Sequence, residues 1–284
     1  MIGVVVCTRN RAERLDRCLA SFAPGDGNYE IVIVDNGSED ATKSVVARHA
    51  KRLPLAYVFE PARGLSSARN RGIAQLQHPV IAFTDDDCLV AADWLSAITA
   101  AFDAHPDVAI VGGKVEPASA IEARVSTRMH DAFERVATAE RVLSLMSGCN
   151  MAFRREVFVR VGTFDPGFGK GRPIGSGEDL DIMYRALRAG LAIVYTPDVV
   201  VRHAHGRDNS DAVAAVGRDY VRGRGAFYCK FIADRHIARM AYWETAALLR
   251  QAFKDANARA VLLGLAAGAL HQSINAMRAA HRAR

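Results

Sequence analysis

The chain has 284 residues, of which 50% are hydrophobic and 24% charged, and its formal net charge is +6. This composition is ordinary for a globular protein, and the length suffices for one large α/β domain with an appendage. The five cysteines are scattered singly, which argues against a zinc site or a disulfide framework and favours reduced thiols in a cytosolic protein. No apolar run approaches the roughly 20 residues that span a bilayer. The opening run, IGVVVC, is too short and too uncharged at its start for a signal peptide.

Strands and helices are predicted to alternate through the first third of the chain. Four apolar, β-rich runs predict strands, in the order IGVVVC, YEIVIVD, LAYVFE and VIAF. Helices are predicted around Leu15 to Phe22, from near Ser38 to Asp40 onward, and up to about Leu76. Continuous apolar strands that alternate with helices predict a parallel sheet covered on both faces.

The unusual polar residues fall where these predicted strands end. They are Thr8 to Arg11, Asp35 with Asn36, Arg63 to Asn70, and Asp85 to Asp87. In parallel α/β sheets ligands bind beyond the carboxyl ends of the strands. The coincidence therefore predicts a binding site at this edge.

Three consecutive carboxylates, Asp85, Asp86 and Asp87, follow the strand VIAF. A continued strand would bury at least one unpaired charge, so the strand is expected to end at an open edge. Clustered oxygen ligands suit Mg²⁺ or Mn²⁺, often held together with substrate phosphates. A solvated acidic turn before the next helix is the alternative.

The polar loops also suit a nucleotide. Asp35 can accept a hydrogen bond from a base N–H or a ribose hydroxyl, or it can cap the following helix. Arg63, Arg69 and Arg71 can face a diphosphate, because the planar guanidinium suits oxyanions; a surface ion pair is the alternative for Arg71. The sequence contains neither G-x-G-x-x-G nor G-x-x-x-x-G-K-[ST], so dinucleotide and P-loop interpretations lose their usual support.

Several segments, taken in order, resemble family 2 glycosyltransferases of the GT-A fold. They are VVVCTRNR, IVIVDNGSEDAT, GLSSARNRGI, FTDDDC, SGCNMAFRREVFVRVGTFDPGF, GSGEDLDIMYRALRAG and DVVVRHAHG, and they extend over roughly residues 2–206. The resemblance implies a Rossmann-like α/β fold with a mostly parallel sheet flanked by helices. It further implies a catalytic domain at 1–206, with a donor half (1–113) and an acceptor half (114–206), and a helical C-terminal extension at 207–284.

The same resemblance implies roles for individual residues in binding a nucleotide-diphosphate-sugar. The nucleoside and diphosphate pocket would be lined by Thr8, Arg11, Asp35, Arg63, Arg69 and Asn70. Asp85 would contact the ribose, and Asp86 would lie near the sugar. Asp87 would ligate Mn²⁺ or Mg²⁺, and His203 would complete the metal shell or touch the diphosphate.

Catalysis is expected from the pair Glu178–Asp179 in GSGEDLD. By the resemblance, Asp179 is the base that deprotonates the acceptor hydroxyl in an inverting displacement, and Glu178 helps to position the acceptor. The segment also predicts a helix with Asp179 in its first turn, where the helix dipole favours an ionised carboxylate. Simple capping of that helix is the alternative for both residues.

The expected activity is metal-dependent transfer from a nucleotide-sugar, with UDP preferred from family frequency, to a glycan or glycolipid in cell-surface polysaccharide synthesis. One competing hypothesis is a nucleotidyltransferase that makes nucleotide-sugars, although CTRNRAER lacks the glycines of that class. The other is a non-catalytic scaffold that binds nucleotide-sugars. Neither the sugar nor the acceptor is identified by any residue.

For two regions the sequence predicts helices but does not define a single role. Residues 115–145 are expected to be mostly helical and to shape the acceptor pocket. From Arg202 onward there are 14 Lys/Arg against 6 Asp/Glu, and two or three amphipathic helices are predicted beyond Asp211. The basic surplus fits an anionic partner or a solvated helix face, and we expect no nucleic-acid partner. The helices would contact the inner face of the membrane peripherally, cover the core as a lid, or form a homodimer interface; the spacing of Gly264 and Gly268 permits close helix contact.

Overall fold

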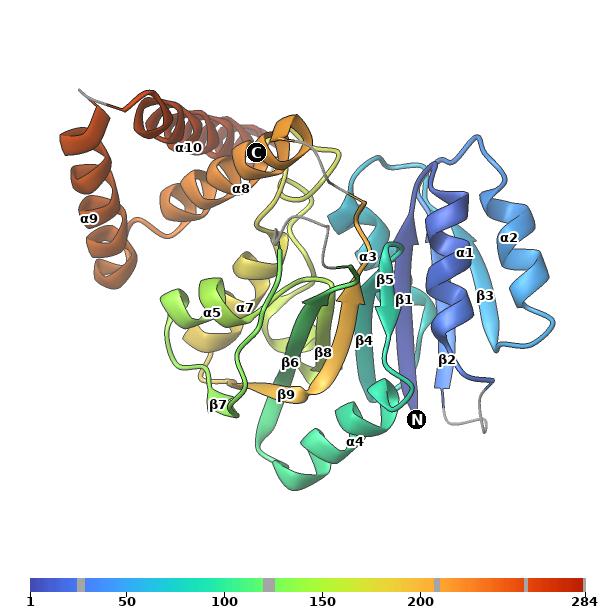
Figure 1. Cartoon of the computed structure of the whole chain (residues 1–284). Helices are drawn as coiled ribbons and strands as arrows, with labels where there is room; N and C mark the ends of the chain where they lie inside the picture. Colours follow the sequence, from blue (N-terminus) through green and yellow to red (C-terminus); the bar gives the residue numbers. More distant parts are fainter. Residues whose placement is uncertain (25–28, 120–125, 207–209, 253–254, 283–284) are drawn as a thin grey trace.

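The computed structural model describes residues 1–24, 29–119, 126–206, 210–252 and 255–282. Its centre is a sheet with the strand order β3-β2-β1-β4-β8-β6-β9-β5, and β7 pairs with β9 (Figure 1). The strands are β1 (Ile2–Thr8), β2 (Tyr29–Asp35), β3 (Leu55–Phe59), β4 (Val80–Asp85), β5 (Cys88–Val90), β6 (Val108–Pro117), β7 (Glu134–Arg135), β8 (Asn150–Arg154) and β9 (Ala192–His203). The helices of this part are α1 (Ala12–Ser21), α2 (Thr42–His49), α3 (Leu65–Gln75), α4 (Trp94–Ala104), α5 (Ala139–Leu145), α6 (Glu156–Val161) and α7 (Glu178–Arg188).

The first four strands pair in parallel, as the alternation of strands and helices predicts. Their register places Thr8 beside Asp35, and Cys7 beside Asp85. The carboxyl ends of β1, β2 and β4 are therefore level with one another. One edge of the sheet thus carries the polar residues that follow all three strands.

Apolar side chains cover both faces of the sheet. In β1, Val4 and Val6 pack into one cluster with residues of α1, α2 and α4, whereas Val5 packs into the other with residues of α3, α5, α6 and α7. This is the two-residue alternation of a strand that is buried on both sides. The expected α/β architecture, with helices on both faces of a mostly parallel sheet, is confirmed for the first half of the chain.

The second half adds antiparallel strands. β8 pairs antiparallel with both β4 and β6, while β9 is parallel to β6 and antiparallel to β5. The expectation of a mostly helical segment at 115–145 is wrong for its described residues, because β6 extends to Pro117, β7 follows at Glu134–Arg135, and α5 alone is helical. The mixed charge of this segment reflects an irregular surface connection rather than helix faces.

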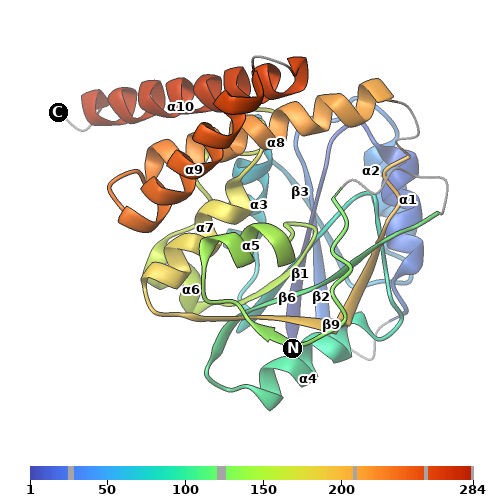
Figure 2. The same ribbon diagram turned by 60° about the vertical axis from the view of Figure 1, so that its left-hand side comes forward.

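Three C-terminal helices follow: α8 (Ser210–Lys230) and α10 (Ala256–Arg282) lie over the carboxyl edge of the sheet, and α9 (Arg235–Ala252) lies to one side of it (Figure 2). Glycines allow the backbones of α8 and α10 to approach closely. A Cβ on Gly225 would collide with the carbonyl of Leu265, and one on Gly268 would collide with the carbonyl of Arg222. The close helix contact expected from the glycine spacing in α10 is therefore present.

Gly268→Ala is expected to lower the free energy of unfolding by about 1–3 kcal/mol, because the added methyl forces α10 away from α8. Gly217→Ala is the matched control, since a Cβ on Gly217 in α8 meets no atom within 4 Å. This control should gain about 0.5–1 kcal/mol from the better helix propensity of alanine. Thermal unfolding followed by circular dichroism measures both, and equal midpoints for the two variants would contradict the contact.

The apolar helix α10 differs from the sequence expectation in one respect. Its segment Ala256–Ala280, with a mean hydropathy of 1.3, is long and apolar enough to cross a membrane by length and composition alone, and 11% of it is buried. From the sequence, no apolar segment long enough to span a bilayer was expected. The polar residues interspersed in α10 hide the signal when only uninterrupted apolar runs are counted.

Candidate active site

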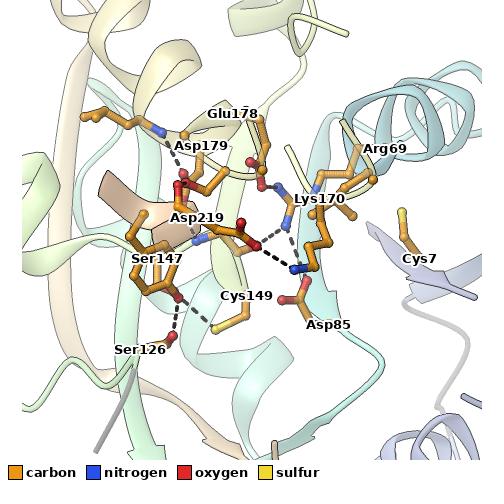
Figure 3. A pocket seen from close by; sticks show the side chains of 18 of the residues that line it. Cys7, Arg69, Asp85, Ser126, Ser147, Cys149, Lys170, Glu178, Asp179 and Asp219 are labelled. Atoms are coloured by element: carbon orange, nitrogen blue, oxygen red, sulfur yellow. Dashed lines mark hydrogen bonds and ion pairs between the residues drawn. The ribbon is translucent and has the colours of Figure 1, made fainter. Parts of the chain in front are cut away.

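A cavity of about 590 Å³ opens at the carboxyl edge of the sheet, under α8 (Figure 3). It is formed by the ends of β1, β4 and β9, the starts of α3 and α7, the segment 146–149 and the loop that precedes α7. Ten of the twelve predicted site residues line it: Thr8, Arg11, Arg63, Arg69, Asp85, Asp86, Asp87, Glu178, Asp179 and His203. The two predicted carboxylate groups therefore share one cavity.

Arg69 connects these two carboxylate groups. It donates hydrogen bonds to Glu178 at 2.8 Å and to Asp85 at 3.3 Å, and also to the carbonyl of Gly148 at 3.0 Å. Its side chain is 3% exposed, and its guanidinium lies over the ring of Phe164 at 5.4 Å. The expectation that Arg69 faces a diphosphate stays a prediction, and its N–H groups are directed at protein acceptors between β4 and α7.

Glu178 is buried against Arg69 at the start of α7. Burial and the neighbouring Asp179 carboxylate together raise the pKa of Glu178 to about 7, against the lowering effect of Arg69. Because Glu178 is 6% exposed, its carboxylate acts on the cavity through Arg69 more than by direct contact. A fixed Arg69 in turn fixes Asp85 on the opposite side of the guanidinium.

Asp179 is half-buried and is held at both oxygens. The N–H of Gly148 donates to Oδ2 at 2.8 Å, and the N–H of Leu180 donates to Oδ1 at 2.9 Å. The second bond is a contact within the first turn of α7, so the capping alternative accounts for one oxygen. The first bond reaches across the cavity floor and aims the carboxylate beside segment 146–149 (Figure 3).

The three consecutive aspartates have different surroundings. The side chain of Asp85 is 32% exposed, whereas those of Asp86 and Asp87 are 4% and 3% exposed. Asp86 accepts from the Thr8 hydroxyl at 2.8 Å and from Arg11 at 2.9 Å. Burial raises the pKa of Asp86 to about 6, against the lowering effect of Arg11. Asp86 was expected near the sugar, but its carboxylate is directed at β1 and Arg11, which leaves Asp85 as the accessible member.

Asp87 and His203 form the deepest pair of the site. Antiparallel pairing places Cys88 of β5 opposite His203 of β9, and His203 Nε2 lies 3.2 Å from Asp87 Oδ1. Burial alone would lower the pKa of His203, but the hydrogen bond with Asp87 and the surrounding acidic groups raise it to about 9. The two elements thus bring a carboxylate and an imidazole together from positions 116 residues apart.

This pair has the donor set of a divalent cation site. Ligand atoms of Asp87, Cys88 and His203 all lie within 4.8 Å of one another. A hydrogen bond with Cys149 and burial raise the pKa of the Cys88 thiol well above its usual value. The carboxylate oxygen of Asp87 and the imidazole nitrogen of His203 form a ligand pair that fits Mn²⁺.

Two predicted site residues, Asp35 and Asn70, are absent from the cavity lining. Asp35 accepts from the Tyr57 hydroxyl and from the N–H of Ser38, both at 2.8 Å, so it stabilises the turn after β2. The amide of Asn70 exchanges two hydrogen bonds with the backbone of Phe164. Their polar atoms make hydrogen bonds within the fold, and the nucleotide contact expected for both residues stays a prediction.

Several lining residues were missed by the sequence analysis. Lys170 lies in the loop GFGKGRPIGSG, and α8 contributes Val216, Asp219, Tyr220 and Arg224. The glycines of the loop were a signal, because Gly169, Gly171, Gly175 and Gly177 all have positive φ. The residues of α8 have no local signal, since only the folded chain brings that helix over the cavity. Of the three positions considered for the C-terminal helices, that of a lid on the core therefore describes α8.

Comparisons with known proteins identify one family. Residues 3–162 match the family model described as "Glycosyl transferase family 2". The chain is similar to Glycosyltransferase AglE of Haloferax volcanii, with 28% identity over 213 residues, which are 71% of this chain and 66% of that protein. The match therefore spans slightly less than two thirds of that curated relative.

Solved structures show the same fold. A mannosyltransferase, PcManGT from Pyrobaculum calidifontis in complex with GDP-Man and Mn²⁺, superposes with a TM-score of 0.65 at 24% identity and covers 98% of this chain and 84% of that one. Staphylococcus aureus TarS 1–349 in complex with UDP-GlcNAc gives a TM-score of 0.62 at 16% identity, over 97% of this chain and 91% of that one. At these identities the likeness establishes the fold.

Proposed function

Because this chain belongs to glycosyltransferase family 2, we propose that it moves a sugar from a nucleotide-diphosphate-sugar to an acceptor hydroxyl, with inversion at the anomeric carbon. One observation carries the proposal: the carboxylates that end β4 and those that begin α7 line a single cavity. An inverting displacement needs one group at the leaving diphosphate and another at the incoming hydroxyl. Neither a buried capping pair nor an acidic surface turn would require such a shared space.

The proposed base is Asp179. Its two hydrogen bonds from N–H groups leave lone pairs on the carboxylate for an acceptor hydroxyl. As the new bond to the anomeric carbon forms, Asp179 takes the hydroxyl proton. Glu178 positions this group through Arg69. No nucleophilic side chain is required, because a single displacement passes through no covalent intermediate.

The proposed donor site lies at the ends of β1, β4 and β9. The proposed role of Asp85 is to accept a hydrogen bond from a ribose hydroxyl; it lines the cavity, as does Arg63 beside α3. Asp87 and His203 would hold Mn²⁺ or Mg²⁺, which when bound stabilises negative charge on the departing diphosphate. A UDP-sugar is the proposed donor; UDP-GlcNAc in one structural neighbour supports this, and GDP-Man in another makes GDP the comparison to test.

Chelation tests the proposal. Purified protein is expected to hydrolyse one of a panel of UDP- and GDP-sugars slowly, because water can replace the acceptor. EDTA should reduce this hydrolysis to the background rate, and Mn²⁺ should restore it. Release of the sugar and the nucleotide is followed by chromatography. Hydrolysis that continues unchanged in EDTA would contradict the assignment of Asp87 and His203, and no hydrolysis of any donor would favour a binding scaffold.

The acceptor and the location remain proposals. We propose a glycan or glycolipid acceptor in cell-surface polysaccharide synthesis, with a cytoplasmic protein whose segment 211–284 reaches the membrane or a second copy. Large apolar side chains exposed on α9 and α10 support a contact of this kind: Tyr242, Trp243, Leu249, Leu263, Leu270 and Met277. Liposome flotation and sedimentation equilibrium separate membrane binding from dimerisation. The division into donor half, acceptor half and extension at 113 and 206 is likewise proposed.

A further inference from the structure

Most cationic side chains around the cavity form ion pairs or hydrogen bonds with other groups of the protein. Arg11 pairs with Asp86 and Asp87, and Arg69 pairs with Glu178 and Asp85. The guanidinium of Arg128 donates to three backbone carbonyls, those of Thr127, Leu143 and Met146. Arg224 pairs with Glu244. The diphosphate of a nucleotide-sugar carries two negative charges and gains a third as the sugar leaves, so a cation beyond one divalent ion would stabilise the departing nucleotide.

Lys170 is differently placed. Its side chain is 69% exposed, and its ammonium lies 2.6 Å from the carboxylate of Asp219 of α8 (Figure 3). The carbonyl of Lys170 accepts from the N–H of Leu65, which fixes the backbone beside the start of α3. Positive φ at Gly169 and Gly171 flanks the residue. The backbone is therefore anchored at the donor side, while the long side chain is free to reorient.

Asp219 does not depend on Lys170 alone. Its carboxylate is 12% exposed and also receives Arg222 from the next turn of α8. Its carbonyl accepts from the Ser176 hydroxyl at 2.8 Å, which ties α8 to the loop before α7. When Lys170 leaves, Arg222 still balances the charge of Asp219. An ion pair with one largely exposed partner costs little to break.

We propose that Lys170 is a diphosphate-binding residue that Asp219 holds aside in the free protein. On donor binding, the ammonium exchanges the Asp219 carboxylate for a phosphate oxygen of the donor. This inference rests on the proposed function, because it assumes that a nucleoside diphosphate enters the cavity. Asp219 then reduces donor affinity, and Lys170 increases it. The two members of one ion pair thus have opposite effects on binding.

Isothermal titration with UDP and, separately, with inorganic pyrophosphate, each with Mn²⁺, tests the assignment. Lys170→Met is expected to weaken both ligands by about tenfold or more, the loss of one hydrogen bond to a charged group. Asp219→Asn keeps the side-chain size and is expected to tighten both ligands about two- to fivefold. In the Lys170→Met background, Asp219→Asn should change neither affinity. Lys51→Met, which removes an exposed charge outside the cavity, is the matched control and should leave both affinities unchanged.

Each other outcome overturns the proposal. If both single variants weaken binding, the pair is structural. If Asp219→Asn still tightens binding without Lys170, the carboxylate acts by direct repulsion of the ligand. If wild-type protein binds and Lys170→Met binds equally well, the residue has no contact with the diphosphate. If wild-type protein binds neither UDP nor pyrophosphate, the donor site itself is refuted together with this inference.

Discussion

Asp179→Asn is expected to lower the rate of sugar transfer by about 10²–10⁴-fold while donor affinity stays unchanged. Asparagine has the size of aspartate, and its amide oxygen can still accept from the N–H of Gly148, while the local bond from the N–H of Leu180 is lost. What is lost is the group that takes the acceptor proton. The expected change lies in kcat, measured with the donor and acceptor that the hydrolysis screen and subsequent acceptor panel identify.

Glu156→Gln is the matched control for this variant. Glu156 also occupies the first turn of a helix, α6, but it is exposed and lies outside the cavity. Its neutralisation should leave kcat unchanged. An Asp179→Asn protein that transfers sugar at the wild-type rate would remove the base from the mechanism and return the chain to the scaffold hypothesis.

Arg69→Met is expected to lower the free energy of unfolding by about 3–5 kcal/mol, because it leaves the buried Glu178 without its cation. For a chain of this size the midpoint of thermal unfolding should fall by roughly 10 °C. Arg71→Met is the control on the same helix, since Arg71 is exposed and does not line the cavity. Its effect should stay within about 0.5 kcal/mol.

The loss caused by Arg69→Met should depend on pH. The pKa of Glu178 is already raised to about 7, and removal of Arg69 raises it further. A carboxyl whose folded-state pKa lies above its unfolded value stabilises the fold below the unfolded pKa, and this stability disappears as the pH rises through the folded pKa. The variant should therefore differ least from wild type at about pH 5 and most at about pH 8. Urea unfolding at both values measures this, and a difference independent of pH would contradict the role of Glu178.

The strand ends of the first half could be predicted from the sequence because each depends on local pattern. β1, β2 and β4 are continuous apolar runs, and a parallel arrangement places their polar termini at one edge. This arrangement predicts that Thr8 and the aspartates at the end of β4 lie together at the carboxyl edge of the sheet. The correct choice of Asp87 and His203 as neighbours came from the family resemblance, since β5 and β9 pair over more than 100 residues of sequence.

Other features depend on contacts that no local pattern contains. Asp35 has the residue type and position of a nucleotide ligand, but Tyr57 on the neighbouring strand β3 occupies one of its oxygens. The side-chain amide of Asn70 forms hydrogen bonds with the backbone of Phe164, which is 94 residues away in the sequence. Residues 115–145 were misassigned because mixed charge occurs equally on helix surfaces and on irregular connections. The part of the wall that α8 provides could not be placed, because its position is set by contacts with α10 and with Ser176.

The close seating of α8 on α10 has a consequence for the products that the cavity can yield. A sugar activated at the anomeric carbon reacts with whichever hydroxyl reaches it, and solvent is present at far higher concentration than any acceptor. Val216, Asp219 and Tyr220 of α8 line the cavity together with Asp179. The close contact between α8 and α10 at Gly225 and Gly268 therefore determines how well bulk solvent is excluded. In the proposed reaction, the last quarter of the chain would therefore determine how much of the donor is transferred to the acceptor and how much is hydrolysed.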